Sequence, residues 1–200
     1  MPDLFIVAGP NGAGKSTHAE GYLPKGLQLF NGDAVFASLK SRYPEISPER
    51  LSGGVAVALE KARDSALAIR RSFAFETNYS SSMAQEMVGL FKQKGYRCNL
   101  VYFGLDNIFE SLARVNNRVR LGGHDVSKEV VQFNFEEGIK LINEDLPHFE
   151  KIEFVRTDYE RPVEIVAISN RTGSYKTILA NDVKWFNKYF RRAFEKIQFL

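Results

Sequence analysis

Short apolar runs alternate with longer amphipathic segments along most of the chain. The apolar runs predict strands over residues 4–8, 27–30, 72–77, 99–104 and 152–155. The segments between them predict helices over residues 34–42, 47–69, 80–94, 106–121 and 127–146. This alternation of strand and helix predicts a parallel sheet flanked by helices, which is an α/β fold.

The C-terminal part of the chain departs from this alternation. Residues 163–169 and 175–179 flank a turn-forming segment, and together they predict a β-hairpin. A final helix follows, with apolar positions at Val183, Phe186, Phe190, Phe194 and Ile197. An aromatic stripe of this kind usually packs into a core. We therefore expect one domain over residues 1–200, with the hairpin and helix of 160–200 as an appendage.

Composition says more about the cellular compartment and the domain size than about the reaction. The 200 residues, of which 44% are hydrophobic, suffice for one full core. Because Cys98 is the single cysteine, an internal disulfide is excluded and a reducing cytoplasm is favoured. The N-terminus lacks signal-peptide features, and no apolar run approaches the ~20 residues of a membrane span. The net charge of +3 suits small anions but is too small to indicate nucleic acid.

The most informative motif of the chain lies directly after the first predicted strand. Its residues are Gly9, Pro10, Asn11, Gly12, Ala13, Gly14, Lys15, Ser16 and Thr17, which complete the pattern G-x-x-x-x-G-K-[ST]. The glycines let the backbone N–H groups converge on phosphate oxygens at the start of a helix. Lys15 would reach the β- and γ-phosphates, and Ser16 would supply a hydroxyl to Mg²⁺. We therefore expect this phosphate loop to bind a nucleoside triphosphate.

A second glycine motif, Leu-Ser-Gly-Gly at residues 51–54, matches the signature of ABC transporter ATPases. It lies too close to the phosphate loop for that family, and no strand ending in Asp-Glu follows it. We interpret residues 51–54 as the first turns of the helix predicted over 47–69.

Two carboxylates follow predicted strands next to the phosphate loop. Asp33 comes after the strand over 27–30, and Glu76 lies at the end of the strand over 72–77. Because the carboxyl ends of parallel strands meet at one edge of a sheet, both are expected near bound phosphate. Phosphoryl transfer to an alcohol often uses a carboxylate near the attacking hydroxyl, and Asp33 is the candidate. Asp33 could instead cap the following helix, and Glu76 could occupy a surface loop.

Arg114 and Arg118 lie four residues apart on one face of the helix predicted over 106–121. The glycine loop at 122–124 follows them and could bring their guanidinium groups over the γ-phosphate. The alternative is a solvated helix face, which is the commoner arrangement for two arginines at this spacing.

Four motifs follow one another in an order that is typical of one enzyme family. They are the phosphate loop, Asn-Gly-Asp at 31–33, Phe-Ala-Phe-Glu-Thr at 73–77, and the run ARVNNRVRLGGHDV at 113–126. With these motifs the chain resembles the zeta-toxin family of small kinases over residues 4–146. The resemblance implies a P-loop kinase-like fold and a dependence on ATP and Mg²⁺. It also implies phosphorylation of a hydroxyl, which in the best-known members is the 3′-hydroxyl of UDP-N-acetylglucosamine.

The resemblance assigns roles residue by residue. The positions it implies for catalysis are Lys15, Asp33, Arg114 and Arg118, and those at the substrate are Asn31, Asp33, Glu76 and Thr77. Asp33 takes the place of the general base, and Glu76 that of a carboxylate that binds the acceptor. Arg118 is the candidate for contact with the γ-phosphate. The implied partner is a hydroxyl-bearing small molecule, with a UDP-sugar as candidate, and an antitoxin protein is compatible with the family.

The match to the family has two departures and one ambiguous position. Phe133 and Asn134 stand where many shorter relatives carry a pair of arginines. The chain is also shorter than the wall-targeting toxins, so part of their acceptor pocket is expected to be absent. His124 matches the family's glycine-histidine loop, but a hydrogen bond that stabilises the turn explains it equally well.

Two other interpretations stay open. The same core serves kinases of other small metabolites or nucleotides, and a nucleotide-dependent binding protein could carry the same phosphate loop. Asp33 separates the kinases from the binding protein, because a switch needs no carboxylate to activate a hydroxyl.

Overall fold

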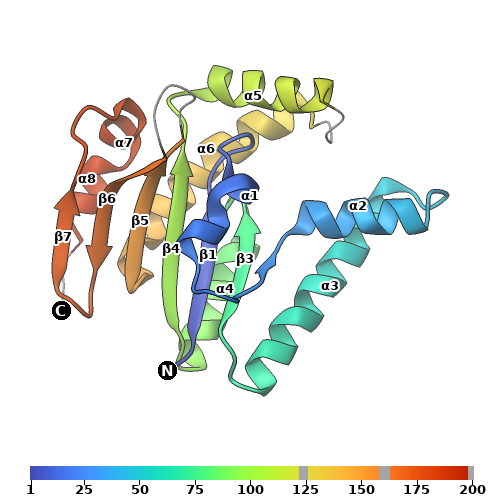
Figure 1. The fold of residues 1–200 in the computed structure, drawn as a ribbon, viewed down its shortest axis with the longest axis horizontal. Helices are drawn as coiled ribbons and strands as arrows, with labels where there is room; N and C mark the ends of the chain where they lie inside the picture. The colour runs from blue at the N-terminus through green and yellow to red at the C-terminus, as the bar shows by residue number, and fades with distance from the viewer. Residues whose placement is uncertain (122–125, 158–162, 198–200) are drawn as a thin grey trace.

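A computed structural model describes residues 1–121, 126–157 and 163–197, and these form one sheet of seven strands. Along the sheet the order is β2-β3-β1-β4-β5-β6-β7 (Figure 1). The strands are β1 (Asp3–Ala8), β2 (Leu29–Phe30), β3 (Phe73–Thr77), β4 (Arg97–Gly104), β5 (Lys151–Arg156), β6 (Glu164–Asn170) and β7 (Tyr175–Ile178). The first five pair in parallel, whereas β6 and β7 run antiparallel. The predicted parallel sheet and C-terminal hairpin are confirmed, and β6 extends the sheet from β5.

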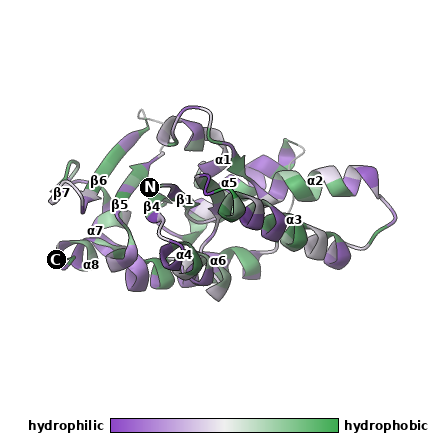
Figure 2. Cartoon of the chain, turned by 90° about the horizontal axis from the view of Figure 1, so that it is seen from below, coloured by the Kyte–Doolittle hydropathy of each residue, from purple (hydrophilic) through white to green (hydrophobic). Residues whose placement is uncertain are grey.

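The helices lie mainly on one face of this sheet. They are α1 (Lys15–His18), α2 (Gly32–Arg42), α3 (Pro48–Ala68), α4 (Ser82–Gln93), α5 (Ile108–Arg120), α6 (Lys128–Asp145), α7 (Lys184–Tyr189) and α8 (Arg191–Glu195). Two short 3-10 helices, η1 (Ala19–Tyr22) and η2 (Leu146–His148), follow α1 and α6. Figure 2 shows α4, α6, α7 and α8 along one face, whereas α2 and α3 extend to the side. The larger hydrophobic core lies between these four helices and the sheet.

Strand β1 lies inside the sheet between β3 and β4, and its register brings the residues of the candidate site together. Its apolar residues Leu4, Ile6, Val7 and Ala8 are fully buried between β3 and β4, as an interior parallel strand requires. Val7 of β1 pairs with Glu76 of β3, and Phe30 of β2 pairs with Phe75. The residues that follow β1 and β2 therefore lie beside the end of β3.

Asparagines cap both α2 and α5, so the alternative role of Asp33 as a helix cap is wrong. Asn31 Oδ1 accepts a hydrogen bond of 3.0 Å from a backbone N–H in the first turn of α2. Asn107, rather than Asp106, does the same at 3.0 Å for α5. Asp33 therefore lies inside the first turn of α2, where its side chain is exposed and is not needed as a cap.

The predicted last helix is two short helices, α7 and α8, because helical geometry breaks at Phe190 (φ −124°, ψ −27°). All five residues of the aromatic stripe are nevertheless buried, so their predicted place in the core is confirmed. The ring of Phe154 on β5 lies with its centroid 5.1, 5.0 and 5.8 Å from those of Phe186, Phe190 and Phe194. This aromatic cluster attaches the C-terminal helices to the sheet.

Helices α2 and α3 form an arm beside the sheet, and both are fully described. Helix α2 buries no side chain, and α3 buries Leu51 and Ala66 alone. Residues 51–54 form early turns of α3, as predicted. Helix α3 has 21 residues, yet neither it nor any other helix in the described part of the chain is apolar and long enough to cross a membrane.

Phe154→Ala is expected to lower the free energy of unfolding by about 3–5 kcal/mol, because it leaves a cavity among three buried rings. Urea unfolding of the purified protein measures this change. Phe133→Ala is the matched control, since Phe133 on α6 is 56% exposed. Its change should stay within about 0.5 kcal/mol. Equal changes in the two variants would contradict the anchoring role of the aromatic cluster.

Candidate functional site

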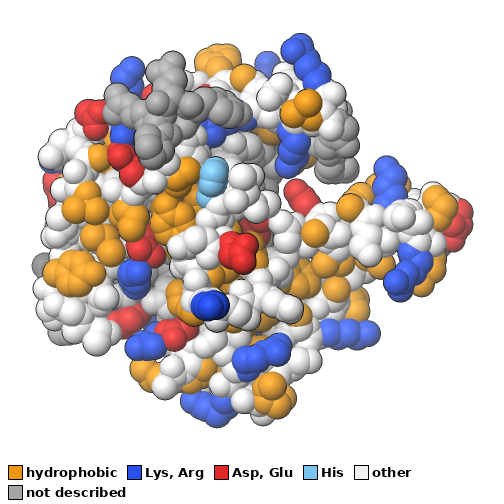
Figure 3. Space-filling view, in the orientation of Figure 1, with side chains coloured by type: hydrophobic (Ala, Val, Ile, Leu, Met, Phe, Trp, Pro, Cys, Tyr) orange, Lys and Arg blue, Asp and Glu red, His pale blue; other side chains and the backbone are white. Residues whose placement is uncertain are grey.

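A cleft of about 930 Å³ opens beside the carboxyl ends of β1, β2 and β3. It is lined by the phosphate loop, the start of α2, the end of β3, one face of α5 and Thr157 after β5. Figure 3 shows the molecule hollowed between its body and the α2–α3 arm. The strand register therefore gathers the motifs predicted from the sequence into one cavity.

The phosphate loop needs glycine at two positions where other elements approach it closely. Gly9 has φ +144°, and a Cβ there would lie 2.2 Å from the backbone oxygen of Phe103 on β4. Gly12 has φ +78°, and a Cβ there would lie 2.8 Å from Cβ of Arg114 on α5. Larger residues would clash and would also be strained in this backbone conformation. The glycine pattern thus reflects close packing as well as the turn itself.

Three side chains from other elements hold the phosphate loop in place. Ser111 Oγ on α5 donates to the backbone oxygen of Asn11 at 2.6 Å. Asn134 Nδ2 on α6 donates to Oδ1 of Asn11 at 2.9 Å. Thr157 Oγ1 donates to the backbone oxygen of Ala13 at 2.8 Å. The loop is therefore ordered by the protein before any ligand binds.

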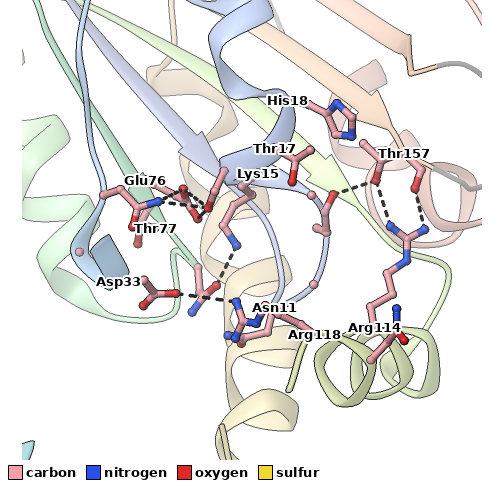
Figure 4. Close-up of a pocket in the computed structure, with 18 of the residues that line it drawn as sticks. Asn11, Lys15, Thr17, His18, Asp33, Glu76, Thr77, Arg114, Arg118 and Thr157 are labelled. Carbon is pink, nitrogen blue, oxygen red and sulfur yellow. Dashed lines mark hydrogen bonds and ion pairs between the residues drawn. The ribbon is translucent and has the colours of Figure 1, made fainter. Parts of the chain in front are cut away.

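Lys15 lies buried beneath the loop with its ammonium at the cleft (Figure 4). Its Nζ donates to the backbone oxygens of Gly9 and Pro10 at 2.8 and 3.0 Å, and to Oδ1 of Asn78 at 3.0 Å. Burial lowers the pKa of Lys15 to about 8, although the nearby carboxylates of Glu76 and Asp33 act to raise it. Within the described residues, all three of its hydrogen-bond acceptors are neutral oxygens.

Ser16, Glu76 and Asn31 form a hydrogen-bonded group beside Lys15. Ser16 Oγ donates to Oε2 of Glu76 at 2.7 Å, and Asn31 Nδ2 donates to the same oxygen at 2.9 Å. A hydroxyl and a carboxylate are the hard oxygen ligands that Mg²⁺ prefers. The described residues contain no group of three or more His, Cys, Asp or Glu side chains placed to hold a metal. A divalent cation here would thus depend on ligand oxygens as well as on Ser16 and Glu76.

Asp33 and Arg118 point toward one another from opposite sides of the cleft (Figure 4). Arg118 Nη1 lies 3.9 Å from Oδ2 of Asp33, and the two side chains are 39% and 70% exposed. An ion pair this long and this exposed adds little stability. The pair is better placed to meet a charged ligand than to hold α2 against α5.

Arg114 has a different place, although it lies one turn from Arg118. Its Nη2 donates to the backbone oxygen of Thr157 at 2.6 Å and to Oε1 of Glu110 at 2.7 Å. Its Nη1 donates to Oγ1 of Thr157 at 3.2 Å. Arg114 thus fixes the segment after β5 against α5, and through Thr157 it supports the phosphate loop.

The remaining predicted residues fall into two groups. Thr17 and Thr77 line the cleft, and Thr77 Oγ1 accepts a hydrogen bond of 2.9 Å from the backbone N–H of Tyr79. The glycine-histidine loop, including His124, lies outside the described residues. Residues 11–17 of the loop and the residues Asn31, Asp33, Glu76, Arg114 and Arg118 line the same cleft.

Sequence reasoning missed three polar residues of the site: Asn78, Ser111 and Thr157. None belongs to a recognisable motif. Ser111 lies 100 positions along the chain from its partner in the loop, and Thr157 lies 144 positions from its own. Only the folded sheet brings them together. Asn78 follows Glu76-Thr77 directly, and its place after β3 was the one available signal.

Comparison with curated proteins gives a relative that is shorter than this chain. A protein of Haemophilus influenzae, described as an uncharacterized protein, is 29% identical over 141 residues. The match covers 66% of this chain and 91% of that protein. A family model, AAA_33, described as an AAA domain, matches residues 4–136.

Solved structures show the same fold at low sequence identity. A chain of the AvrRxo1-ORF1:-ORF2 structure with ATP has a TM-score of 0.73 and 16% identity, with 94% of this chain covered. The match covers 63% of that chain, so the present chain spans less than two thirds of it. A chain of the PezAT toxin–antitoxin system of Streptococcus pneumoniae has a TM-score of 0.63 and 16% identity, with 98% of this chain and 82% of that one covered.

These likenesses show a P-loop kinase-like fold, in agreement with the sheet order and the phosphate loop. The family model covers more than half of the chain, from β1 into α6, and it includes every predicted site residue. The chain therefore belongs to the AAA domain family that this model defines.

Proposed function

We propose that this protein is a kinase that transfers the γ-phosphate of ATP to a hydroxyl group of a small molecule. The observation that supports this best is a single cleft in which the phosphate loop and the exposed carboxylate of Asp33 lie together, with Arg118 3.9 Å from that carboxylate. Binding of a nucleotide alone would need the loop but not a carboxylate opposite it.

The nucleotide end of the cleft fits a triphosphate. The loop conformation is fixed by its glycines and by three side-chain hydrogen bonds, so little ordering entropy remains to be lost on binding. Among the described residues, no carboxylate is bonded to the buried ammonium of Lys15, so phosphate oxygens would bring it a direct counter-charge. The AvrRxo1-ORF1:-ORF2 structure, which has the same fold, is described as containing ATP, and this supports ATP as the nucleotide.

Ser16 and Glu76 fit the magnesium ion that accompanies a triphosphate. The Ser16 hydroxyl would be a direct ligand, and Asn31 holds the Glu76 carboxylate beside it. When bound, the ion would neutralise phosphate charge. Glu76 would contact either a water of the ion or the acceptor molecule.

The acceptor end of the cleft lies at the start of α2. Asp33 would accept the proton of the attacking hydroxyl, because its carboxylate is exposed there and is not used to cap the helix. Arg118 would stabilise negative charge that develops on the transferred phosphate. Asn31, Glu76 and Thr77 would orient the acceptor from the ends of β2 and β3.

For the acceptor itself we propose a UDP-N-acetyl-sugar. The support is the zeta-toxin motifs between residues 9 and 126 and the structural likeness to a chain of the PezAT toxin–antitoxin system. One structural relative is described as AvrRxo1-ORF1:-ORF2, and the other comes from the PezAT toxin–antitoxin system. We therefore also propose an antitoxin-like protein as a partner.

One observation favours a different small-molecule acceptor. Asn134 stands where shorter zeta-toxin relatives carry an arginine, and its amide is engaged with Asn11 and Ser80 at 2.9 and 2.6 Å. It therefore holds the loop instead of adding positive charge to the cleft. A panel of UDP-sugars, nucleosides and nucleotides, each scored by acceptor-dependent ADP release, separates the two candidates.

Asp33→Asn is expected to slow phosphoryl transfer by about 10²–10⁴-fold, because the amide keeps the shape of the side chain but cannot accept the proton. The melting temperature should change little, since Asn31 caps α2 and Asp33 contributes at most a favourable charge of about 0.3–1 kcal/mol near the helix N-terminus. Acceptor-dependent ADP release and a thermal melt measure the two quantities.

Lys15→Ala is the control for this assay, because it should abolish ATP turnover whichever acceptor is used. If the Asp33→Asn rate stayed within about threefold of wild type, general-base catalysis by Asp33 would be ruled out. ADP release retained in Lys15→Ala would contradict the phosphate-loop assignment itself.

The two arginines of α5 are expected to behave differently. Arg118→Ala should slow transfer by about 10²-fold with a small effect on stability, because its guanidinium would act on the developing charge. Arg114→Ala should lower the free energy of unfolding by about 1–3 kcal/mol, because Thr157 and Glu110 lose their partner. Parallel rate and unfolding measurements test this, and similar profiles for both variants would contradict the assignment.

A further inference from the structure

Asn78 is a polar residue of the cleft that no motif assigns, and its amide has a forced orientation. Lys15 Nζ lies 3.0 Å from Oδ1 of Asn78. A lysine ammonium can donate hydrogen bonds but cannot accept them, so the oxygen of the amide must face it. The nitrogen, Nδ2, must therefore face away from Lys15.

Nδ2 of Asn78 is open to the cleft. Among the described residues, Nδ2 donates to no group. It is also not one of the fully buried polar atoms without a hydrogen-bond partner, so it is not shut off from solvent. Since Asn78 is half-buried and lines the cleft, this nitrogen is exposed within it. The two N–H donors of this nitrogen thus lie beside Lys15, the residue expected to contact phosphate.

The backbone around Asn78 is fixed tightly, so these donors have a defined place. Gly138 of α6 approaches so closely that a Cβ there would lie 2.6 Å from the backbone oxygen of Asn78. Tyr79 has φ +59°, an unusual conformation for a residue other than glycine. The neighbouring Ser80 donates to Oδ1 of Asn134 at 2.6 Å.

Tyr79 anchors this segment to the core. Its side chain is fully buried, and its hydroxyl donates to Oδ2 of Asp145 at 2.6 Å. Burial and this hydrogen bond raise the pKa of Tyr79, so the hydroxyl keeps its proton and remains a donor. Strain at one residue that is held by several contacts is typical of segments that position functional groups.

We propose that Asn78 binds an oxygen of the terminal phosphate of ATP through Nδ2, while its Oδ1 holds Lys15. The proposal rests on the proposed nucleotide binding and adds a further substrate contact to it. The chemistry fits, because a fixed amide donor next to an ammonium is suited to a phosphate oxygen. The terminal phosphate is favoured because Asn78 is hydrogen-bonded to Lys15, and the lysine of a phosphate loop contacts the β- and γ-phosphates.

Two variants separate this role from simple support of Lys15. Asn78→Asp keeps the shape and keeps an oxygen for Lys15, but it replaces the N–H donors with a negative oxygen. Asn78→Ala removes both functions. If Asn78 served Lys15 alone, both variants would weaken ATP and ADP binding alike, because Lys15 also reaches the β-phosphate. If Nδ2 contacts phosphate, ATP affinity should fall in the order wild type, alanine, aspartate.

The experiment is calorimetric titration of the full chain with ATP and, separately, with ADP, both with magnesium. Asn78→Ala should weaken ATP binding by about tenfold, as expected for the loss of a hydrogen bond to a charged group. ADP binding should change much less, because ADP lacks the terminal phosphate. Asn116→Asp on α5 is the charge control, since Asn116 is exposed and does not line the cleft.

The outcomes distinguish this proposal from the proposed function. ATP binding by Asn78→Asp at the wild-type level, or equal losses for ATP and ADP, would overturn the contact with the terminal phosphate. Failure of the wild-type protein to bind either nucleotide would overturn the proposed function, and the Asn78 contact with it. A thermal melt of each variant checks folding, and Asn78→Asp still decides the question if the alanine variant is destabilised.

Discussion

The burial of one ammonium group is the constraint around which the site is built. A buried lysine loses its hydration, so its charge must be met by oxygens that the fold supplies. The loop turns through glycine conformations to present the backbone oxygens of Gly9 and Pro10, and the segment after β3 presents Asn78. Glu76 and Asp33 act on Lys15 from nearby without bonding it. The buried positive charge of Lys15 therefore favours binding of an anion in the cleft.

Much of the fold follows from simple patterning. An interior parallel strand is buried on both faces and therefore reads as an apolar run, as β1 does, and five short apolar runs predicted the five parallel strands. The same topology places whatever follows each strand at one edge of the sheet. For that reason the positions of Asp33 and Glu76 beside the phosphate loop could be predicted without coordinates.

Other features depend on contacts that no local pattern encodes. Arg114 and Arg118 are the same residue type on one helix face, yet the partner of Arg114, Thr157, lies 43 residues away and is placed by β5. The caps of α2 and α5 were also not settled by the local sequence, because an asparagine and an aspartate stand close together at the start of each helix. Similarly, the break at Phe190 allows rings from two short helices to contact Phe154. Periodicity alone predicts one continuous helix at this place.

The α2–α3 arm has a consequence for how such a protein can diverge. Because α2 buries no side chain and α3 buries only two, most substitutions there change the free energy of unfolding little. The loop and the sheet, in contrast, are tightly packed around Gly9, Gly12 and Lys15. A lineage can therefore alter the surface beside Asp33 while its phosphate-binding half stays constant. New substrate preferences can arise in the loosely packed part of the molecule without a loss of foldability.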